Sequence, residues 1–154
     1  EKCRYGIHDI SRVELDENLK LPRFNMPFEL GIFYSAKVFG KKYQRMKNCI
    51  VLEKYRHRYQ KFISDISGVD VTPNGNSVKK SIFAIRNWLV TTSKRTTIPH
   101  GIEVYNRYIR FRRDIKRIGK KKGVDFKSMP FVELTRNMTD WLKLNQNRNE
   151  PLFG

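Results

Sequence analysis

Three short apolar runs divide the first half of the sequence: Cys3-Arg4-Tyr5-Gly6-Ile7-His8-Asp9-Ile10, Cys49-Ile50-Val51-Leu52 and Val69-Asp70-Val71-Thr72. Helical patterns follow them, from about Met26 to Gly40, from roughly His57 to Ile66, and after Ser77. Short apolar strands that alternate with helices are typical of parallel βαβ units. The sequence therefore predicts an α/β fold in which three strands form half of a doubly wound parallel sheet.

The first and third helices carry recognisable start signals. We expect Asn25 to be the N-cap of the first helix, with Pro27 in its first turn, where a missing N–H has no cost. Apolar residues lie on almost all sides of this helix, so we expect it to be largely buried. Ser77 is the expected cap of the third helix. Its apolar face is predicted to contain Val78, Ile82, Ile85, Trp88 and Leu89.

The pattern changes after Lys94, where Thr96–Pro99 is predicted to be a linker. Two helices follow with no strand between them, and each has an apolar stripe at spacings of three and four residues. The stripes contain Val104, Tyr108, Phe111, Ile115 and Ile118 in the first helix, and Phe131, Leu134, Met138 and Trp141 in the second. The sequence predicts an α/β domain over residues 1–95 and a basic extension over 96–154 that forms an α-helical hairpin.

The composition is strongly basic. The 154 residues include 32 Lys and Arg against 15 Asp and Glu, a formal net charge of +17. Such a charge favours phosphates, nucleotides, nucleic acids or anionic lipids without choosing among them. No run approaches 18 consecutive apolar residues and no signal-peptide pattern is recognised, so no membrane span is expected. Cys3 and Cys49 lie in apolar runs, where reduced, buried thiols are expected. These features together predict a cytoplasmic protein.

Glu29 is the residue that most needs an explanation. On the predicted helix it shares a side with Asn25 and otherwise with apolar or small residues. In one interpretation Asn25 caps the helix and Glu29 complements its positive N-terminal end. In the other, Glu29 faces a cleft, and Asn25 orients either Glu29 or a ligand hydroxyl. The residues alone leave both interpretations open.

The motif Asn25-x-x-x-Glu29-Leu30-Gly31 follows a strand that ends in Asp and precedes the strand Cys49–Leu52. In this setting residues 1–95 resemble the bacterial TIR-like and nucleoside 2-deoxyribosyltransferase-like nucleotide-binding superfamily. The resemblance implies a partial flavodoxin-like sheet whose first two strands lie upstream of Glu1. It also implies that Glu29 is a catalytic carboxylate acting at the ribose of NAD or a nucleoside, in a hydrolase of the kind attached to bacterial stress or phage-defence systems.

The carboxyl ends of the strands are the expected ligand site, because ligands of open α/β sheets bind there. Six side chains should meet at this edge: Asp9, Ser11, Arg12, Glu53, Tyr55 and Arg56. Asp9 would bind ribose hydroxyls, and Arg12 or Arg56 a phosphate. Cleavage of an N-glycosidic bond builds positive charge on the sugar, which a carboxylate such as Glu29 can stabilise or capture. Alternatively, Asp9 caps its own loop, and the arginines are ordinary surface charge or partners of Glu14 and Asp16.

The helix predicted from Gly101 to Lys122 is the most basic part of the chain. From Lys94 to Lys122, eleven Lys and Arg face two acidic residues, Glu103 and Asp114. One-sided charge of this kind favours nucleic acid or an acidic partner, although a basic helix face is also commonly just solvated. The predicted contacts are Arg110, Arg113 and Arg117, acting on phosphates, because no zinc-finger or RNP-like motif supports base-specific binding.

Two functions therefore remain open from the sequence. The first is an enzyme that acts on NAD or a nucleoside as substrate, without a separate cofactor. The second is a non-catalytic nucleotide-sensing module whose basic helices hold nucleic acid. No metal site is predicted, because His8, His57 and His100 lack a ligand spacing. Three parallel strands leave exposed edges, so we also expect missing upstream strands and self-association, including a homo-oligomer.

Overall fold

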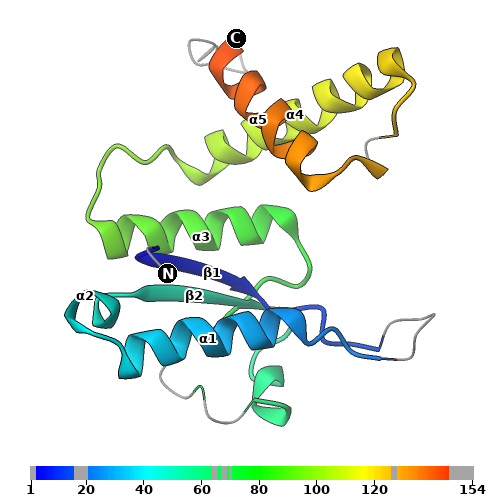
Figure 1. The fold of residues 1–154 in the computed structure, drawn as a ribbon. Coiled ribbons are helices and arrows are strands. Elements are labelled where there is room, and N and C mark those ends of the chain that lie inside the picture. The colour runs from blue at the N-terminus through cyan, green and yellow to red at the C-terminus, as the bar shows by residue number, and fades with distance from the viewer. Residues whose placement is uncertain are drawn as a thin grey trace. The chain divides into compact units, whose positions relative to one another are not determined.

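The computed structural model describes residues 3–15, 21–63, 66, 69, 71–125 and 128–145. Strands β1 (Tyr5–Asp9), β2 (Asn48–Glu53) and β3 (Val71–Pro73) form a parallel sheet in the order β1-β2-β3 (Figure 1). In the register, Ile7 lies opposite Ile50, and Val51 lies opposite Val71. The predicted α/β fold with three parallel strands is confirmed.

Helices α1 (Asn25–Phe39) and α3 (Val78–Ser93) cover opposite faces of this sheet, as Figure 1 shows. Alternate side chains of β1 point to the two helices, because successive strand residues face opposite ways. His8 packs edge-on against Phe33 of α1, with ring centroids 5.1 Å apart. Tyr5 packs edge-on against Trp88 of α3 at 5.8 Å. The two faces are thus covered by different helices, as in a doubly wound sheet.

The main core lies between the sheet and α1. Its buried members are Ile10, Leu30, Phe33, Cys49, Val51 and Ile66. Cys49 is therefore buried as expected, whereas the expectation of a buried Cys3 is wrong, because Cys3 precedes β1 and is exposed. Gly6 permits the close approach of β1 to this helix, because a Cβ there would lie 2.8 Å from His8 Nε2 and 2.9 Å from the Phe33 ring. A larger residue at position 6 would push α1 away from the strand.

Two expectations for α1 are wrong. The N-cap position is occupied by Phe24, without a side-chain hydrogen bond, and Asn25 is the exposed first residue of the helix. The helix is also not largely buried: Leu30 and Phe33 are its buried residues, whereas Phe28 is 68% exposed and Ile32 51%. A helix that is apolar on all sides does not reveal which side meets the sheet, and a single sheet face covers only one of them.

The segment after β2 also differs from the prediction. Instead of a helix over His57–Ile66, its described residues include a 3-10 turn, η1 (Arg58–Lys61), and none of them is α-helical. His57 adopts a left-handed conformation with φ 62° immediately before this turn, which breaks a regular helix there. A short helix not expected from the sequence, α2 (Lys42–Arg45), precedes β2. The cap of α3 is confirmed, with Ser77 Oγ accepting from the Lys80 N–H at 3.4 Å.

The chain divides into two compact units, residues 1–101 and 102–154. The linker stays with the first unit, because the Arg86 guanidinium on α3 donates to the carbonyls of Ile98 (3.2 Å) and Pro99 (2.9 Å). The second unit is the predicted helical hairpin, made by α4 (Gly101–Lys122) and α5 (Phe131–Leu144). None of the helices in the described ranges is long and apolar enough to cross a membrane.

The hairpin has its own small core. Phe111 and Ile115 of α4 pack with Trp141 and Leu134 of α5. The Phe111 and Trp141 rings meet edge-on at 5.6 Å, and the Trp141 indole N–H donates to Asp114 Oδ2 at 3.0 Å. All four apolar residues belong to the predicted stripes. The two helices are therefore joined by the faces that the spacing indicated.

Candidate functional site

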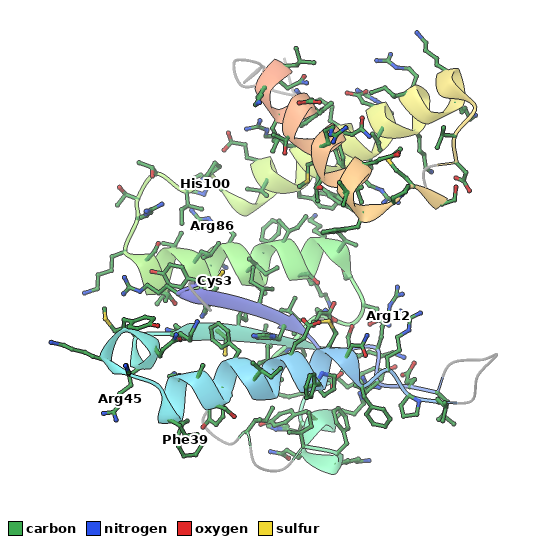
Figure 2. The ribbon with its side chains drawn as sticks, viewed as in Figure 1. Cys3, Arg12, Phe39, Arg45, Arg86 and His100 are labelled. Carbon is green, nitrogen blue, oxygen red and sulfur yellow. The ribbon has the colours of Figure 1, made fainter. Side chains whose placement is uncertain are left out.

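A cavity of about 210 Å³ opens at the carboxyl end of β1, beside the start of α1. Its lining consists of Asp9, Ile10, Arg12, Val13, Arg23 and Met26. Figure 2 places Arg12 at this end of the sheet, with Arg45 and Phe39 at the opposite end. The structure thus brings together two of the predicted site residues, Asp9 and Arg12, and adds Arg23 from the segment just before α1.

The cavity has an apolar floor and a charged rim. Ile10 is fully buried, and Val13 and Met26 are half-buried. Asp9, Arg12 and Arg23 are exposed, so one carboxylate and two guanidinium groups surround the opening. Arginine forms two parallel hydrogen bonds with phosphate or carboxylate oxygens, whereas a carboxylate accepts from hydroxyl groups. The rim therefore suits an anion that also carries hydroxyls.

The start of α1 adds to the positive potential at this cavity. Met26, in the first turn of the helix, is one of the lining residues. The first turn of α1 itself contains no acidic residue, and Phe24 at the cap position makes no side-chain hydrogen bond with it. The first N–H groups of a helix and its dipole both favour negative charge. An anion between Arg12 and Arg23 would therefore lie where helix geometry already favours it.

An ion-pair network around the buried Glu53 fixes the loop that carries the rim. Glu53, the last residue of β2, is fully buried, and its Oε1 accepts from Arg58 Nη2 and from Arg58 Nε at 3.1 Å. The same guanidinium donates to the Ser11 carbonyl at 2.8 Å and to Glu14 Oε1 at 3.0 Å. Glu14 also accepts from Lys54 Nζ at 2.8 Å. Arg58 thereby ties the β1–α1 loop to the end of β2.

These contacts move the pKa values of Glu14, Lys54 and Arg58 in the expected directions. The hydrogen bond from Lys54 lowers the pKa of Glu14 below its ordinary value, and the same contact raises the pKa of Lys54. The hydrogen bond to Glu53 raises the pKa of the Arg58 guanidinium. All three groups are more firmly held in their charged forms by the fold.

Sequence reasoning placed Glu53 at this edge but missed the ion-pair network around it. Arg58, the cation of Glu53, lies five residues further along the chain, but Glu14 lies 44 residues before Arg58, so no local pattern joins all three. The available signal was the position of Glu53 directly after the buried run Cys49–Leu52, because a carboxylate in that place requires a cation. Glu53 Oε2 has no hydrogen-bond partner among the residues that the structure describes.

The remaining predicted site residues are spread over the same end of the unit. Ser11 is buried in the turn after β1, where its N–H donates to Asp9 Oδ1 at 3.0 Å, as the loop-capping interpretation of Asp9 expects. Tyr55 is exposed, and its ring lies 5.1 Å from Lys54 Nζ and 5.8 Å from the Arg58 guanidinium carbon. Arg56 is exposed in the loop after β2.

Glu29 and Asn25 do not line the described cavity. Both are exposed on α1, and Glu29 lies three residues beyond the lining residue Met26. Among the predicted nucleic-acid contacts on α4, Arg113 and Arg117 are exposed, whereas Arg110 is half-buried. The carboxylate present at the cavity is therefore Asp9.

No protein-family model, curated protein or solved structure matches the chain. Within the described ranges, no group of three or more His, Cys, Asp or Glu residues is arranged to hold a metal ion. The chemistry that the described site offers consists of its arginines, its carboxylates and the helix start.

Proposed function

We propose that the first unit is a nucleotide-binding domain that holds a phosphorylated nucleoside at the carboxyl end of β1. The observation that carries this proposal is the cavity with Arg12 and Arg23 on its rim, Asp9 beside them and the first turn of α1 in its wall. In this assignment the two arginines and the helix start bind phosphate, and Asp9 accepts hydrogen bonds from ribose hydroxyls.

The size of the cavity indicates which part of the ligand it would hold. At about 210 Å³ it is smaller than the roughly 300–1,000 Å³ typical of pockets that enclose a whole small molecule. We assign it to the sugar and phosphate, with the base lying outside the described lining. The exposed ring of Tyr55, in the loop after β2, is one surface on which a base could stack.

The topology supports the same location. In flavodoxin-like sheets the strand order is 2-1-3-4-5, so the last three strands are adjacent in sequence order. The order β1-β2-β3 is the order that three such strands would give, in keeping with the TIR-like resemblance. Doubly wound sheets bind their ligands beyond the carboxyl ends of the strands.

Binding without turnover is the form of the proposal that the geometry favours. N-glycosidic cleavage requires a carboxylate that is free to act at the reacting carbon of the sugar. Glu29 is exposed on α1 outside the described lining, and Asp9, which belongs to the lining, accepts the Ser11 N–H and is assigned to the ribose hydroxyls. The enzymatic form can be tested separately by incubating the protein with NAD and nucleosides and measuring release of free base. Release that is abolished by Glu29→Gln would establish it, since the amide keeps the shape but cannot stabilise a cationic sugar.

The binding proposal is tested by calorimetric titration with AMP, ADP-ribose and adenosine. Arg12→Gln and Arg23→Gln should each weaken AMP binding at least about tenfold, because a hydrogen bond to a charged group contributes about 1.5–3 kcal/mol. Arg45→Gln is the matched control, an exposed arginine at the opposite end of the sheet, and should stay within about twofold of wild type (Figure 2). Equal AMP affinity in all four proteins, or equal affinity for adenosine and AMP, would refute the proposal.

A further inference from the structure

One side of α4 carries a continuous row of exposed cations. We call this row the cationic face. Its members, all exposed, are Arg113, Lys116, Arg117, Lys120 and Lys121. Spacings of three and four residues place them on one side of the helix, and Arg113 and Arg117 have side chains 76% and 74% exposed.

The other side of the helix is fixed by the hairpin core. Phe111 and Ile115 are buried against Trp141 of α5, so α4 cannot rotate without breaking this packing. Gly119 is buried on the same side. The cationic face is therefore held outward by the hairpin itself, which limits the entropy lost when the side chains bind a partner.

The acidic residue nearest to the cationic face does not neutralise it. Asp114 Oδ2 accepts the Trp141 indole N–H at 3.0 Å, so this carboxylate is engaged in joining α5 to α4. Its Oδ1 lies 3.6 Å from Arg113 Nε and 3.9 Å from Arg117 Nη2, beyond hydrogen-bond distance, and ion pairs of such exposed arginines contribute little. Within the described part of the hairpin, the three lysines of the face form no ion pair with an acidic side chain.

The residue types on this face distinguish a nucleic acid from a protein partner. From Arg113 to Lys121 no apolar side chain is exposed, since Ile115 is buried and Ile118 is half-buried. A protein interface needs a desolvated apolar centre, whereas a phosphate backbone needs cations at regular intervals. Arginine and lysine both bind phosphate oxygens, arginine through paired hydrogen bonds.

We infer that the α4–α5 hairpin is a nucleic-acid-binding arm that binds the phosphate backbone through its cationic face. This site is separate from the nucleotide cavity and does not depend on it. Eight residues of helix rise by about 12 Å, a length over which one strand of a duplex presents about three phosphates. Neutralisation of three phosphates gives a logarithmic salt slope of about −3 for duplex DNA and about −2 for a single strand.

Fluorescence anisotropy with a labelled duplex, a single-stranded DNA and a single-stranded RNA of arbitrary sequence tests this inference. Duplex affinity should fall about 40-fold between about 50 and about 200 mM salt, and single-strand affinity about 20-fold. The triple variant Arg113→Gln/Lys116→Gln/Arg117→Gln should bind at least about tenfold more weakly at low salt. Its salt slope should also become shallower, by about one for each phosphate that is no longer neutralised.

Two further variants separate the face from the overall charge and from folding. Lys41→Gln/Lys42→Gln/Arg45→Gln removes the same charge from the start and body of α2 in the first unit and should leave affinity within about twofold. Lys116→Gln/Lys120→Gln/Lys121→Gln alters no ion pair of the described hairpin and should weaken binding as the first triple does. Far-UV circular dichroism would verify that each variant is folded.

Several outcomes would overturn the inference. Absence of salt-sensitive binding by the wild type would show that the cationic face is merely solvated. Equal losses in the α2 control would assign the binding to net charge rather than to this face. Displacement of the nucleic acid by polyglutamate at equal charge concentration would assign the face to an acidic protein instead.

Discussion

Arg58 is the side chain that joins the most parts of the candidate site. It contacts fully buried Glu53, exposed Glu14 and the Ser11 carbonyl. Arg58→Met should destabilise the first unit by about 3–5 kcal/mol, because it leaves the Glu53 carboxylate buried without its cation. The measurement is urea unfolding followed by circular dichroism. Lys61→Met, at an exposed position of the same 3-10 turn, is the control and should change stability by less than about 0.5 kcal/mol. Equal effects would show that Glu53 does not depend on Arg58.

Glu14 gives the site a defined response to acid. Its pKa is lowered by Lys54 in the folded state, from an ordinary value of 4.5. A lowered pKa stabilises the fold above the ordinary value, and this stabilisation is lost as the pH falls through the lowered value. The wild type should therefore have a higher melting temperature than Glu14→Gln near neutral pH, and this difference in melting temperature should shrink between about pH 5 and about pH 3. A difference in melting temperature that stays constant across this range would contradict the assignment.

At the scale of elements, local signals located most of the helices. Ser77 caps α3, Pro130 precedes α5, and the stripe from Val104 to Ile118 lies within α4. Each of these signals acts within one or two turns, so the sequence alone displays it. The helix expected from His57 was wrong because a left-handed residue and the long-range bonds of Arg58 with Ser11 and Glu14 in the β1–α1 loop determine that segment. The prediction that Asn25 caps α1 was wrong because Asn25 is already the first residue of the helix, so the cap position falls on Phe24.

The candidate site, like the helices, could be predicted from the sequence only in part. Asp9 and Arg12 follow directly from the rule that ligands bind at the carboxyl ends of strands. Arg23 and Met26 join them only because the β1–α1 loop returns to that edge. Glu29 drew attention as a carboxylate on an apolar helix, but its surroundings depend on which side of α1 meets the sheet. Periodicity cannot determine that side when every side is apolar.

The hairpin offers a prediction at the scale of two elements. Trp141→Phe keeps an aromatic ring against Phe111 but removes the indole N–H that donates to Asp114. The loss of a hydrogen bond to a charged group should cost about 1.5–3 kcal/mol, so α5 should open at least about tenfold more often. Amide hydrogen exchange of α5 peptides measures this opening. Unchanged exchange in α5 would mean that the Asp114 hydrogen bond does not hold the hairpin together.

At the scale of the whole molecule, exposed apolar surface predicts self-association. Phe24, Phe28 and Ile32 recur every four residues at the start of α1, and all three are more than half exposed. Such a stripe favours burial against another surface. The wild type should show a sedimentation coefficient that rises with concentration, and Phe28→Gln/Ile32→Gln should remove most of that rise. Phe131→Gln/Val132→Gln, two exposed apolar residues of α5, is the control. The same loss of association in this control, or a monomer at all concentrations, would contradict the prediction.

Binding of a phosphorylated nucleoside in the cavity at the carboxyl end of β1 is the central claim. The most direct measurement is a titration of the isotope-labelled chain with AMP, followed through the chemical shifts of its backbone amides. We predict saturable shifts at Asp9–Val13 and at Arg23–Met26, with none at Lys41–Arg45 on the opposite end of the sheet. Shifts confined to the cationic face of α4, or no shifts at millimolar AMP, would contradict the claim.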